Sequence, residues 1–194
     1  MNKGELRVLV GEYLKRTDFT AVFDNWVRFT SVRIGRALRG QDNLEVEVIA
    51  ALANPQPLSL QFRQMRSVES QQLNSTYRLQ AVDGAANLLA LTGSFPVAYR
   101  IEGFSLQVRP FQALPVTLAY WKEPDALPDD SSTNAVLEAQ PMLYLYGCLV
   151  EAAIWAQDPG SASGYLSVFD NEVATLNVQG SEANGGDTPV MGVG

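Results

Sequence analysis

Apolar residues recur at helical spacing at the start of the chain. Over 3–16 they fall at i, i+3, i+4, i+7 and i+8, which is typical of an amphipathic helix, and Asn2 with Glu5 forms a capping-box signal. A second stripe predicts a helix over 20–39, and the face opposite this stripe carries arginines. These arginines are Arg28, Arg33, Arg36 and Arg39. Two helices are therefore expected to open the chain.

The pattern changes to a period of two after residue 43. Residues 44–48 alternate between apolar side chains and glutamates, which is typical of a half-exposed strand. Three further alternating runs lie between 97 and 120, with glycine and proline between them. Residues 58–95 fit neither period clearly, so their structure stays open at this point. The pattern predicts an antiparallel β insertion over 43–122.

The helical pattern returns towards the C-terminus. Pro141 lies where the first turn of a helix tolerates proline, and the residues after it are apolar on nearly every side, which predicts a buried helix over 141–157. An Asp-Pro pair opens a fourth predicted helix over 159–178. The remaining residues, 179–194, are rich in glycine and poor in apolar side chains, so we expect a flexible tail.

The order of the predicted elements is helix, helix, β region, helix, helix. The apolar stripes at the two ends of the chain can be buried only against each other. We therefore predict an α+β fold with one domain over 1–178. It is expected to be a four-helix bundle built from the N- and C-terminal helices, with an inserted antiparallel β region and a disordered C-terminal tail over 179–194.

Composition narrows the possible chemistry. The 194 residues include no histidine and one cysteine, Cys148. Histidine-based acid–base catalysis, histidine-containing zinc sites and a disulfide framework within the chain are therefore excluded. No secretory signal is recognised, and the apolar stretch at 141–156 is interrupted by Glu151 and is short for a membrane span. We expect a protein made in the cytoplasm that is not an enzyme and holds no cofactor or metal.

Charge is distributed unevenly along the sequence. The formal net charge is −7, from 14 Lys and Arg against 21 Asp and Glu. All 14 basic residues precede residue 123, so residues 1–122 carry a net charge of +4 and residues 123–194 a net charge of −11. Such a separation suits head-to-tail association of identical subunits or two partners of opposite sign, and an unbiased surface charge is the alternative.

Several polar residues have two interpretations each. The arginine face of the second helix can follow nucleic-acid phosphates or form ion pairs with a neighbouring subunit, and the second is favoured. Asp125, Asp129 and Asp130 lack the glycine and glutamate of a calcium loop and are interpreted as an acidic linker. Glu151 is expected to face solvent or a subunit interface, and Cys148 to be a small buried residue.

Three segments carry a further signal. Residues 24–39 read DNWVRFTSVRIGRALR, residues 116–127 read VTLAYWKEPDAL and residues 141–153 read PMLYLYGCLVEAA. They resemble, in the same order, the motifs DNWIRLAEARINRDLR, LEYYAKPPAL and PDLYLYGALAEAA of the head-to-tail adaptor proteins of tailed bacteriophages, also called connector or head-completion proteins. Residues 57–68 lack the aspartate of a further family motif, and 70–95 have no counterpart, so the β insertion is expected to be remodelled.

The resemblance implies a virion structural protein that acts at the head–tail junction and is present in the host cytoplasm during assembly. Adaptors of this kind dock beneath the portal as a ring, usually of twelve copies, and extend the DNA channel. The implied partners are the portal protein, a tail or nozzle protein, sibling subunits and the packaged DNA that passes through the lumen. No membrane is implied.

Two hypotheses about contacts follow. Pro189, Val190 and Met191 give the flexible tail an apolar segment that we expect to insert against the portal, and the four arginines are expected at subunit or partner contacts. The alternative function is a soluble DNA-binding accessory protein that uses the basic face of the second helix.

Overall fold

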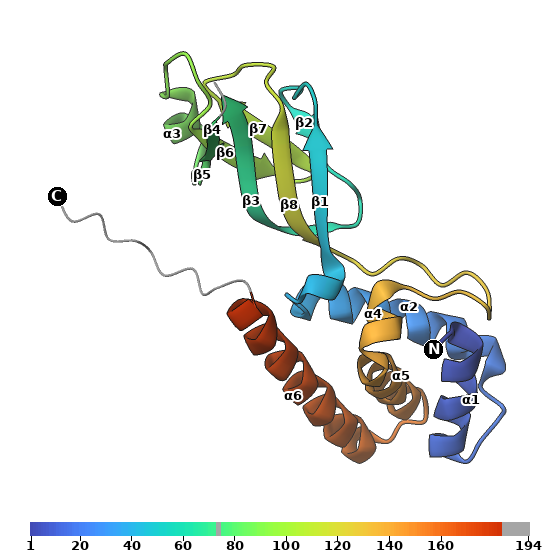
Figure 1. Cartoon of the computed structure of the whole chain (residues 1–194). Helices are drawn as coiled ribbons and strands as arrows, with labels where there is room; N and C mark the ends of the chain where they lie inside the picture. The colour runs from blue at the N-terminus through green and yellow to red at the C-terminus, as the bar shows by residue number, and fades with distance from the viewer. Residues whose placement is uncertain (73–74, 184–194) are drawn as a thin grey trace. The chain divides into compact units, whose positions relative to one another are not determined.

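The computed structural model describes residues 1–72 and 75–183 (Figure 1). The chain forms two compact units. The helical unit contains residues 1–43 and the chain from residue 123 onward, so both ends of the chain contribute to it. The β unit contains residues 44–122.

The described residues contain six α-helices. Their bounds are α1 (Lys3–Leu14), α2 (Thr20–Ala37), α4 (Ala135–Ala139), α5 (Pro141–Trp155) and α6 (Pro159–Ala183) in the helical unit, and α3 (Ala85–Leu89) in the β unit. The capping box of Asn2 and Glu5 is confirmed at the start of α1. Residues 179–183, which we expected in a flexible tail, belong to α6, and the rest of that expectation lies outside the described residues.

The prediction of a four-helix bundle with a β insertion is wrong. The helical unit contains an additional helix, α4, and the strands form two four-stranded sheets with a core of their own. The sequence pattern missed α4 because five residues are too few to show helical periodicity. Asn134 starts this helix, since its side-chain oxygen accepts a hydrogen bond from the Leu137 N–H at 2.8 Å.

The β unit consists of two sheets that share one buried apolar cluster, and a short 3₁₀ helix (Gln41–Asn43) precedes it. The first sheet has the order β1 (Leu44–Ile49), β8 (Val116–Lys122), β3 (Phe62–Gln72) and β4 (Ser75–Arg78), with antiparallel neighbours throughout. The second has the order β2 (Gln56–Pro57), β7 (Ser105–Arg109), β6 (Ala98–Glu102) and β5 (Gln80–Ala81). The β5–β6 pair is parallel, so the expectation of a purely antiparallel region is wrong there.

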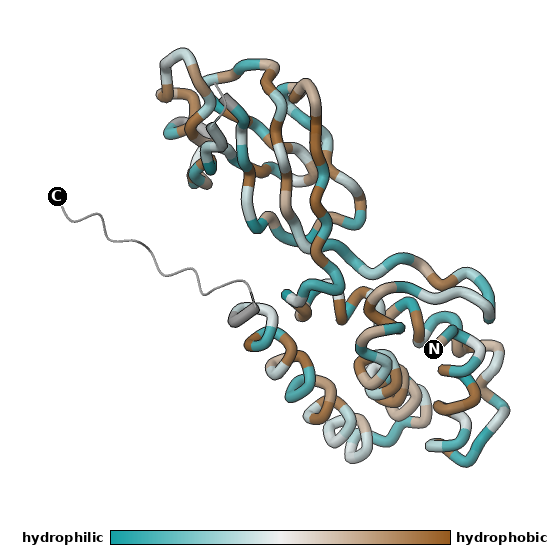
Figure 2. The backbone as a smooth tube through the Cα atoms, in the orientation of Figure 1, coloured by the Kyte–Doolittle hydropathy of each residue, from teal (hydrophilic) through white to brown (hydrophobic). Residues whose placement is uncertain are grey.

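α5 is the central helix of the helical unit. Leu143, Tyr144, Cys148 and Leu149 are fully buried, which confirms that this apolar stretch is a buried helix and that Cys148 is a small buried residue. α6 packs along α5 and shows alternating hydrophilic and hydrophobic stretches in Figure 2, as expected for a helix with one face in solvent. Helices from both ends of the chain therefore share one core.

α2 and α5 approach each other closely at Gly147. A Cβ atom added to Gly147 would lie 2.3 Å from Cγ2 and 2.9 Å from Oγ1 of Thr30, which is closer than non-bonded atoms pack. Thr30 is itself fully buried, and its hydroxyl lies 3.7 Å from the sulfur of Cys148. The spacing of these two helices therefore depends on the absence of a side chain at residue 147.

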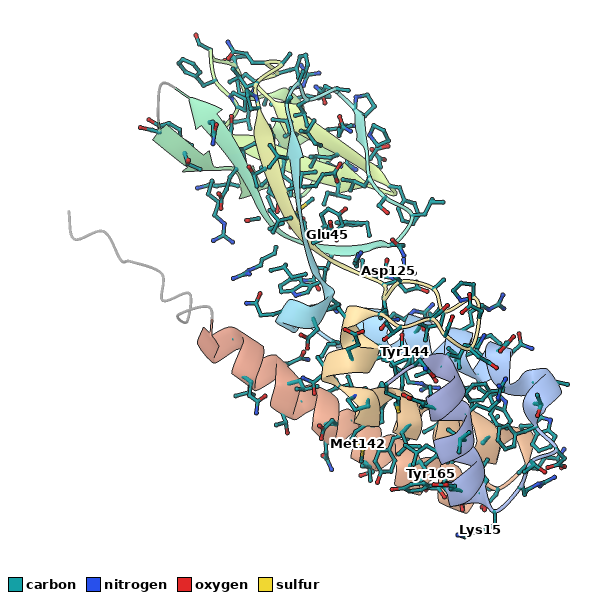
Figure 3. All side chains as sticks on the ribbon, turned by 45° about the vertical axis from the view of Figure 1, so that its right-hand side comes forward. Lys15, Glu45, Asp125, Met142, Tyr144 and Tyr165 are labelled. Atoms are coloured by element: carbon teal, nitrogen blue, oxygen red, sulfur yellow. The ribbon has the colours of Figure 1, made fainter. Side chains whose placement is uncertain are left out.

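The hydroxyl of Tyr144, a residue labelled in Figure 3, connects α5 to α2 and to the start of α4. It lies 3.0 Å from Oγ of Ser31 and accepts a hydrogen bond from Nδ2 of Asn134 at 2.9 Å. Asn134 also donates to the backbone carbonyl of Asp125 at 2.7 Å. A buried hydroxyl with two partners thus fixes the acidic linker against the helices.

Lys3 attaches the same linker to the first turn of α1. The residue is only 3% exposed, and its ammonium donates to the carbonyl of Leu127 at 3.1 Å and lies 3.0 Å from the carboxylate of Asp24 on α2. A buried ammonium is stable only when such oxygens surround it. The segment that follows β8 is therefore fixed to two helices at once.

Replacing Gly147 by alanine is expected to lower the free energy of unfolding by about 1–3 kcal/mol, because the new methyl group overlaps Thr30. In a Thr30→Ala background the same change should cost less, which a double-mutant cycle measured by urea denaturation detects. Gly164→Ala on α6 is the control, since an added Cβ there meets no atom within 4 Å. Equal losses at both glycines would contradict this account of the packing.

Alkaline pH is expected to destabilise the helical unit through Cys148. Burial raises the pKa of this thiol to about 12 from an ordinary value of 9.0. The unfolded chain therefore releases the proton first, so the stability present below pH 9 falls as the pH rises towards 12, by up to about 1.4 kcal/mol per pH unit. Urea denaturation at several pH values should show a shallower loss for Cys148→Ala, and an unchanged slope would argue against this origin.

Candidate functional site

The structure separates the four arginines of the predicted helix face, three on α2 and Arg39 just after its end, into two pairs. Arg28 and Arg36 are exposed, and the Arg28 guanidinium lies 5.4 Å from the ring centre of the half-exposed Phe29. Arg33 and Arg39 are partly buried and contact other parts of the helical unit. The arginines therefore do not form one exposed row.

Arg33 forms an ion pair with Glu151 of α5. Nη2 of Arg33 lies 2.6 Å from Oε1 of Glu151, and the Glu151 side chain is only 12% exposed. Glu151 therefore does not face open solvent, and the alternative that it lies at a subunit interface stays a prediction. Glu151 lies one helical turn after Cys148 on the face of α5 that packs on α2, which the sequence alone did not indicate.

Arg39 caps the end of α2. Its guanidinium donates to the carbonyl oxygens of Gly35, Arg36 and Leu38, and burial lowers its pKa. α2 ends at Ala37, two residues before the end expected from the sequence. The Arg39 guanidinium donates hydrogen bonds to carbonyl groups at this end, where the last turn of a helix lacks backbone donors. A guanidinium with three carbonyl partners has little capacity left for a phosphate.

The end of α2 is also attached to α6. The side chain of Asn177 accepts a hydrogen bond from the Arg39 N–H at 2.6 Å and donates to the Ala37 carbonyl at 3.0 Å. A Cβ atom at Gly180 would lie 3.3 Å from the Arg39 carbonyl oxygen, so α6 approaches this turn closely. Sequence patterns gave no signal for this contact.

Two apolar grooves lie on the helical unit. One has a volume of about 460 Å³ and is bordered by Arg33, Val150, Ile154 and Leu166, where α5 and α6 meet. The other has a volume of about 570 Å³ and lies where α1 meets α2. Its lining residues are Arg7, Val8, Gly11, Glu12, Lys15, Arg16, Thr17, Phe19 and Thr20. Grooves of this size with mostly apolar walls are suited to side chains of a protein partner rather than to a small charged ligand.

The acidic linker is held by local hydrogen bonds. Asp129 accepts hydrogen bonds from Ser131 and Ser132, which lower the pKa of its carboxyl group, and Asp130 forms an ion pair with Arg7.

Within residues 1–72 and 75–183, no group of three or more histidine, cysteine, aspartate or glutamate side chains is placed to hold a metal ion. In the same residues, no helix has the length and apolar character needed to cross a membrane.

The fold also changes the distribution of charge. The sequence of the helical unit contains eight basic and sixteen acidic residues, a net charge of −8, whereas the β unit contains six and five, a net charge of +1. The basic N-terminal helices and the acidic C-terminal part of the chain are neighbours in one unit. The strong separation seen along the sequence is therefore largely internal to the helical unit.

Pro189, Val190 and Met191, the proposed apolar segment of the tail, lie outside the described residues. Among the residues that carry the contacts above, Lys3, Asn134 and Asn177 were not singled out from the sequence. Lys3 and Asn177 form hydrogen bonds with residues more than one hundred positions away, and Asn134 bonds to Asp125 and Tyr144, nine and ten positions away, so no helical or strand periodicity shows these contacts.

Removing the Arg33 side chain is expected to lower the free energy of unfolding by about 2 kcal/mol, because Glu151 then lies mostly buried without its cation. The exposed Arg36 is the matched control on the same helix, and Arg36→Ala should change stability by less than about 0.5 kcal/mol. Combining Arg33→Ala with Glu151→Ala should recover part of the loss in urea denaturation. Equal effects of the two single changes would contradict the ion-pair role.

Comparison with known proteins identifies the family to which the chain belongs. The family model of the SU10 adaptor protein matches residues 1–191, which is nearly the whole chain. No curated protein matches the chain. The SU10 adaptors are phage head–tail adaptor proteins, so their place is the head–tail junction of the virion and their partners are other phage head or tail proteins. The chain therefore belongs to the SU10 adaptor protein family, a family of phage structural proteins.

Proposed function

We propose that the protein assembles as a closed ring of twelve copies beneath the portal, where it extends the DNA channel and joins the head to the tail. The observation that carries this proposal is the adaptor family match over residues 1–191. In this role the protein is an assembly component and not an enzyme, it holds no cofactor, and it waits in the host cytoplasm before docking.

The exposed apolar side chains support an assembly role. Val8 is 63% exposed beside the groove at α1 and α2, and Ile154 is 56% exposed beside the groove at α5 and α6. Val178 on α6 is 57% exposed. Exposed apolar side chains that border a groove are typical of surfaces that are covered in an assembly. We assign these grooves to contacts with sibling subunits, the portal and a tail or nozzle protein.

The charge of the helical unit supports passage of DNA rather than its retention. A net charge of −8 on this unit repels phosphates, and Arg33 and Arg39, two of the four arginines on and just after α2, are used within the fold. We propose that acidic residues between 123 and 178 line the lumen, with Arg28 and Arg36 at subunit or partner contacts. Packaged DNA would then slide along a wall that does not bind it.

The C-terminal segment is proposed to contact the portal through Pro189, Val190 and Met191. Because α6 extends to Ala183 and packs on the end of α2, a test of this segment should delete only residues 184–194. Loss of portal binding with an unchanged unfolding transition is the expected result. Undiminished binding by the shortened chain would remove the segment from the portal contact.

The first measurement is the light-scattering mass of the purified protein, alone and mixed with its cognate portal protein. We expect complexes that contain twelve adaptor copies per portal ring, because a closed ring fixes the number of subunits.

The charge-reversal pair Arg28→Glu and Arg36→Glu tests the alternative function, DNA binding, on the same protein. A persistent monomer or dimer that ignores the portal, but shifts duplex DNA at low salt and loses this on charge reversal, would favour the DNA-binding function.

A further inference from the structure

β1 and β4 are the two edges of the first sheet (Figure 1). β1 pairs only with β8 in this sheet, and β4 pairs only with β3. Among the residues that the structure describes, the second long side of each of these strands therefore lies at the edge of the sheet, where a further strand can be added. Since every pairing in the sheet is antiparallel, β1 and β4 run in opposite directions.

β1 has only part of the protection that is common on edge strands, namely its two glutamates, which lie on the same face as the buried Leu118. It pairs with β8 over six residues without a register shift, and it contains neither proline nor lysine. Val46 is 58% exposed and Val48 is 70% exposed. The charged residues of the strand are Glu45, which lies 3.1 Å from the Lys122 ammonium, and Glu47, which accepts a hydrogen bond from the Tyr120 hydroxyl at 3.3 Å. An open apolar edge of this kind is a site for pairing with another strand.

The pairing registers show which side chains of β1 and β4 share a face. One row of paired residues crosses the sheet: Val48, Thr117, Glu69 and Arg78. Side chains alternate between faces along a strand, so Val46 and Thr76 lie on the same face as this row. Glu45, Glu47 and Tyr77 lie on the other face.

We propose that β1 of one copy pairs antiparallel with β4 of the next copy, so that the first sheet continues from subunit to subunit. This inference rests on the proposed ring. In the registers that preserve the faces, Glu45 or Glu47 lies opposite Tyr77, whose hydroxyl donates to the carboxylate, and Val46 lies opposite Thr76 or the stem of Arg78. No like charges oppose each other. The two edges are different surfaces, so the contact is head-to-tail and repeats around a closed ring.

Pairing of β1 with β1 of a second copy is disfavoured by charge. We consider antiparallel registers that join at least four residues of each strand and keep Val46 and Val48 on one face. In every such register, Glu45 or Glu47 lies opposite a glutamate of the other copy. Like charges directly opposite each other destabilise a strand pair. Pairing of β4 with β4 leaves both valines exposed. The β1–β4 contact covers the apolar edge without either cost.

Cysteine cross-linking of the full-length chain tests the contact. A Val48→Cys chain mixed with a Thr76→Cys chain should form a disulfide-linked heterodimer under mild oxidation, since these residues face each other in one of the two registers, and Cys148 is buried and does not compete. Leu60→Cys, at an 80% exposed loop position of the same unit, replaces Thr76→Cys in the control and should form no specific product.

A second measurement uses the ring itself. Val46→Lys with Val48→Lys should weaken ring formation, in solution or on the portal, by about tenfold or more, because it places charges on the apolar edge. The monomer should keep its circular dichroism spectrum and unfolding transition. If the wild-type protein forms a ring and the double-lysine variant forms it equally well, the strand contact is overturned while the proposed ring stands. A Val48→Cys chain that cross-links to itself in preference to Thr76→Cys has the same meaning. A wild-type protein that forms no ring, even with the portal, would overturn the proposed function and this inference together.

Discussion

The close approach of α2 and α5 at Gly147 is the constraint on which the helical unit depends. With no side chain at this position, Thr30 packs against the backbone of α5, and this spacing brings three polar contacts within bonding distance: Ser31 with Tyr144, Thr30 with Cys148, and Arg33 with Glu151. Tyr144 then reaches Asn134, which holds the linker and starts α4. Because packed interiors do not deform continuously, a wider spacing would weaken all of these contacts together.

Electrostatics follow from the same packing. The chain reads as a basic part followed by an acidic part, yet the fold places α1 and α2 beside the acidic C-terminal part of the chain. Lys3, Arg7 and Arg33 each have an acidic partner in the helical unit, and two of these partners come from beyond residue 122. A charge pattern that suggested contacts between subunits is therefore used in part within one subunit. What remains on the helical unit is a net negative charge, which is the basis of the proposal that this unit lines a lumen without binding DNA.

The features left for partners are apolar grooves on the helical unit and an open strand edge on the β unit. These features are consistent with membership of an adaptor family, whose work is assembly rather than chemistry. Grooves receive side chains, whereas a strand edge forms directional backbone hydrogen bonds that set the orientation of the next copy. The two kinds of surface give an adaptor separate means to bind different partners and to bind itself.

The sequence by itself determined the local elements and the family. Apolar periodicity is enough to indicate the helix at α2 and the strand at β1, since each pattern depends on near neighbours in the chain. Three motifs in order were enough for the adaptor resemblance, which the family match confirmed. The tertiary structure decided the rest. It gave the strands a core of their own, added α4, turned Glu151 inward to Arg33 and used Arg39 as a cap. These outcomes depend on contacts between residues that are distant in the sequence or on the end of a helix, where packing and backbone hydrogen bonds, rather than periodicity, determine the structure.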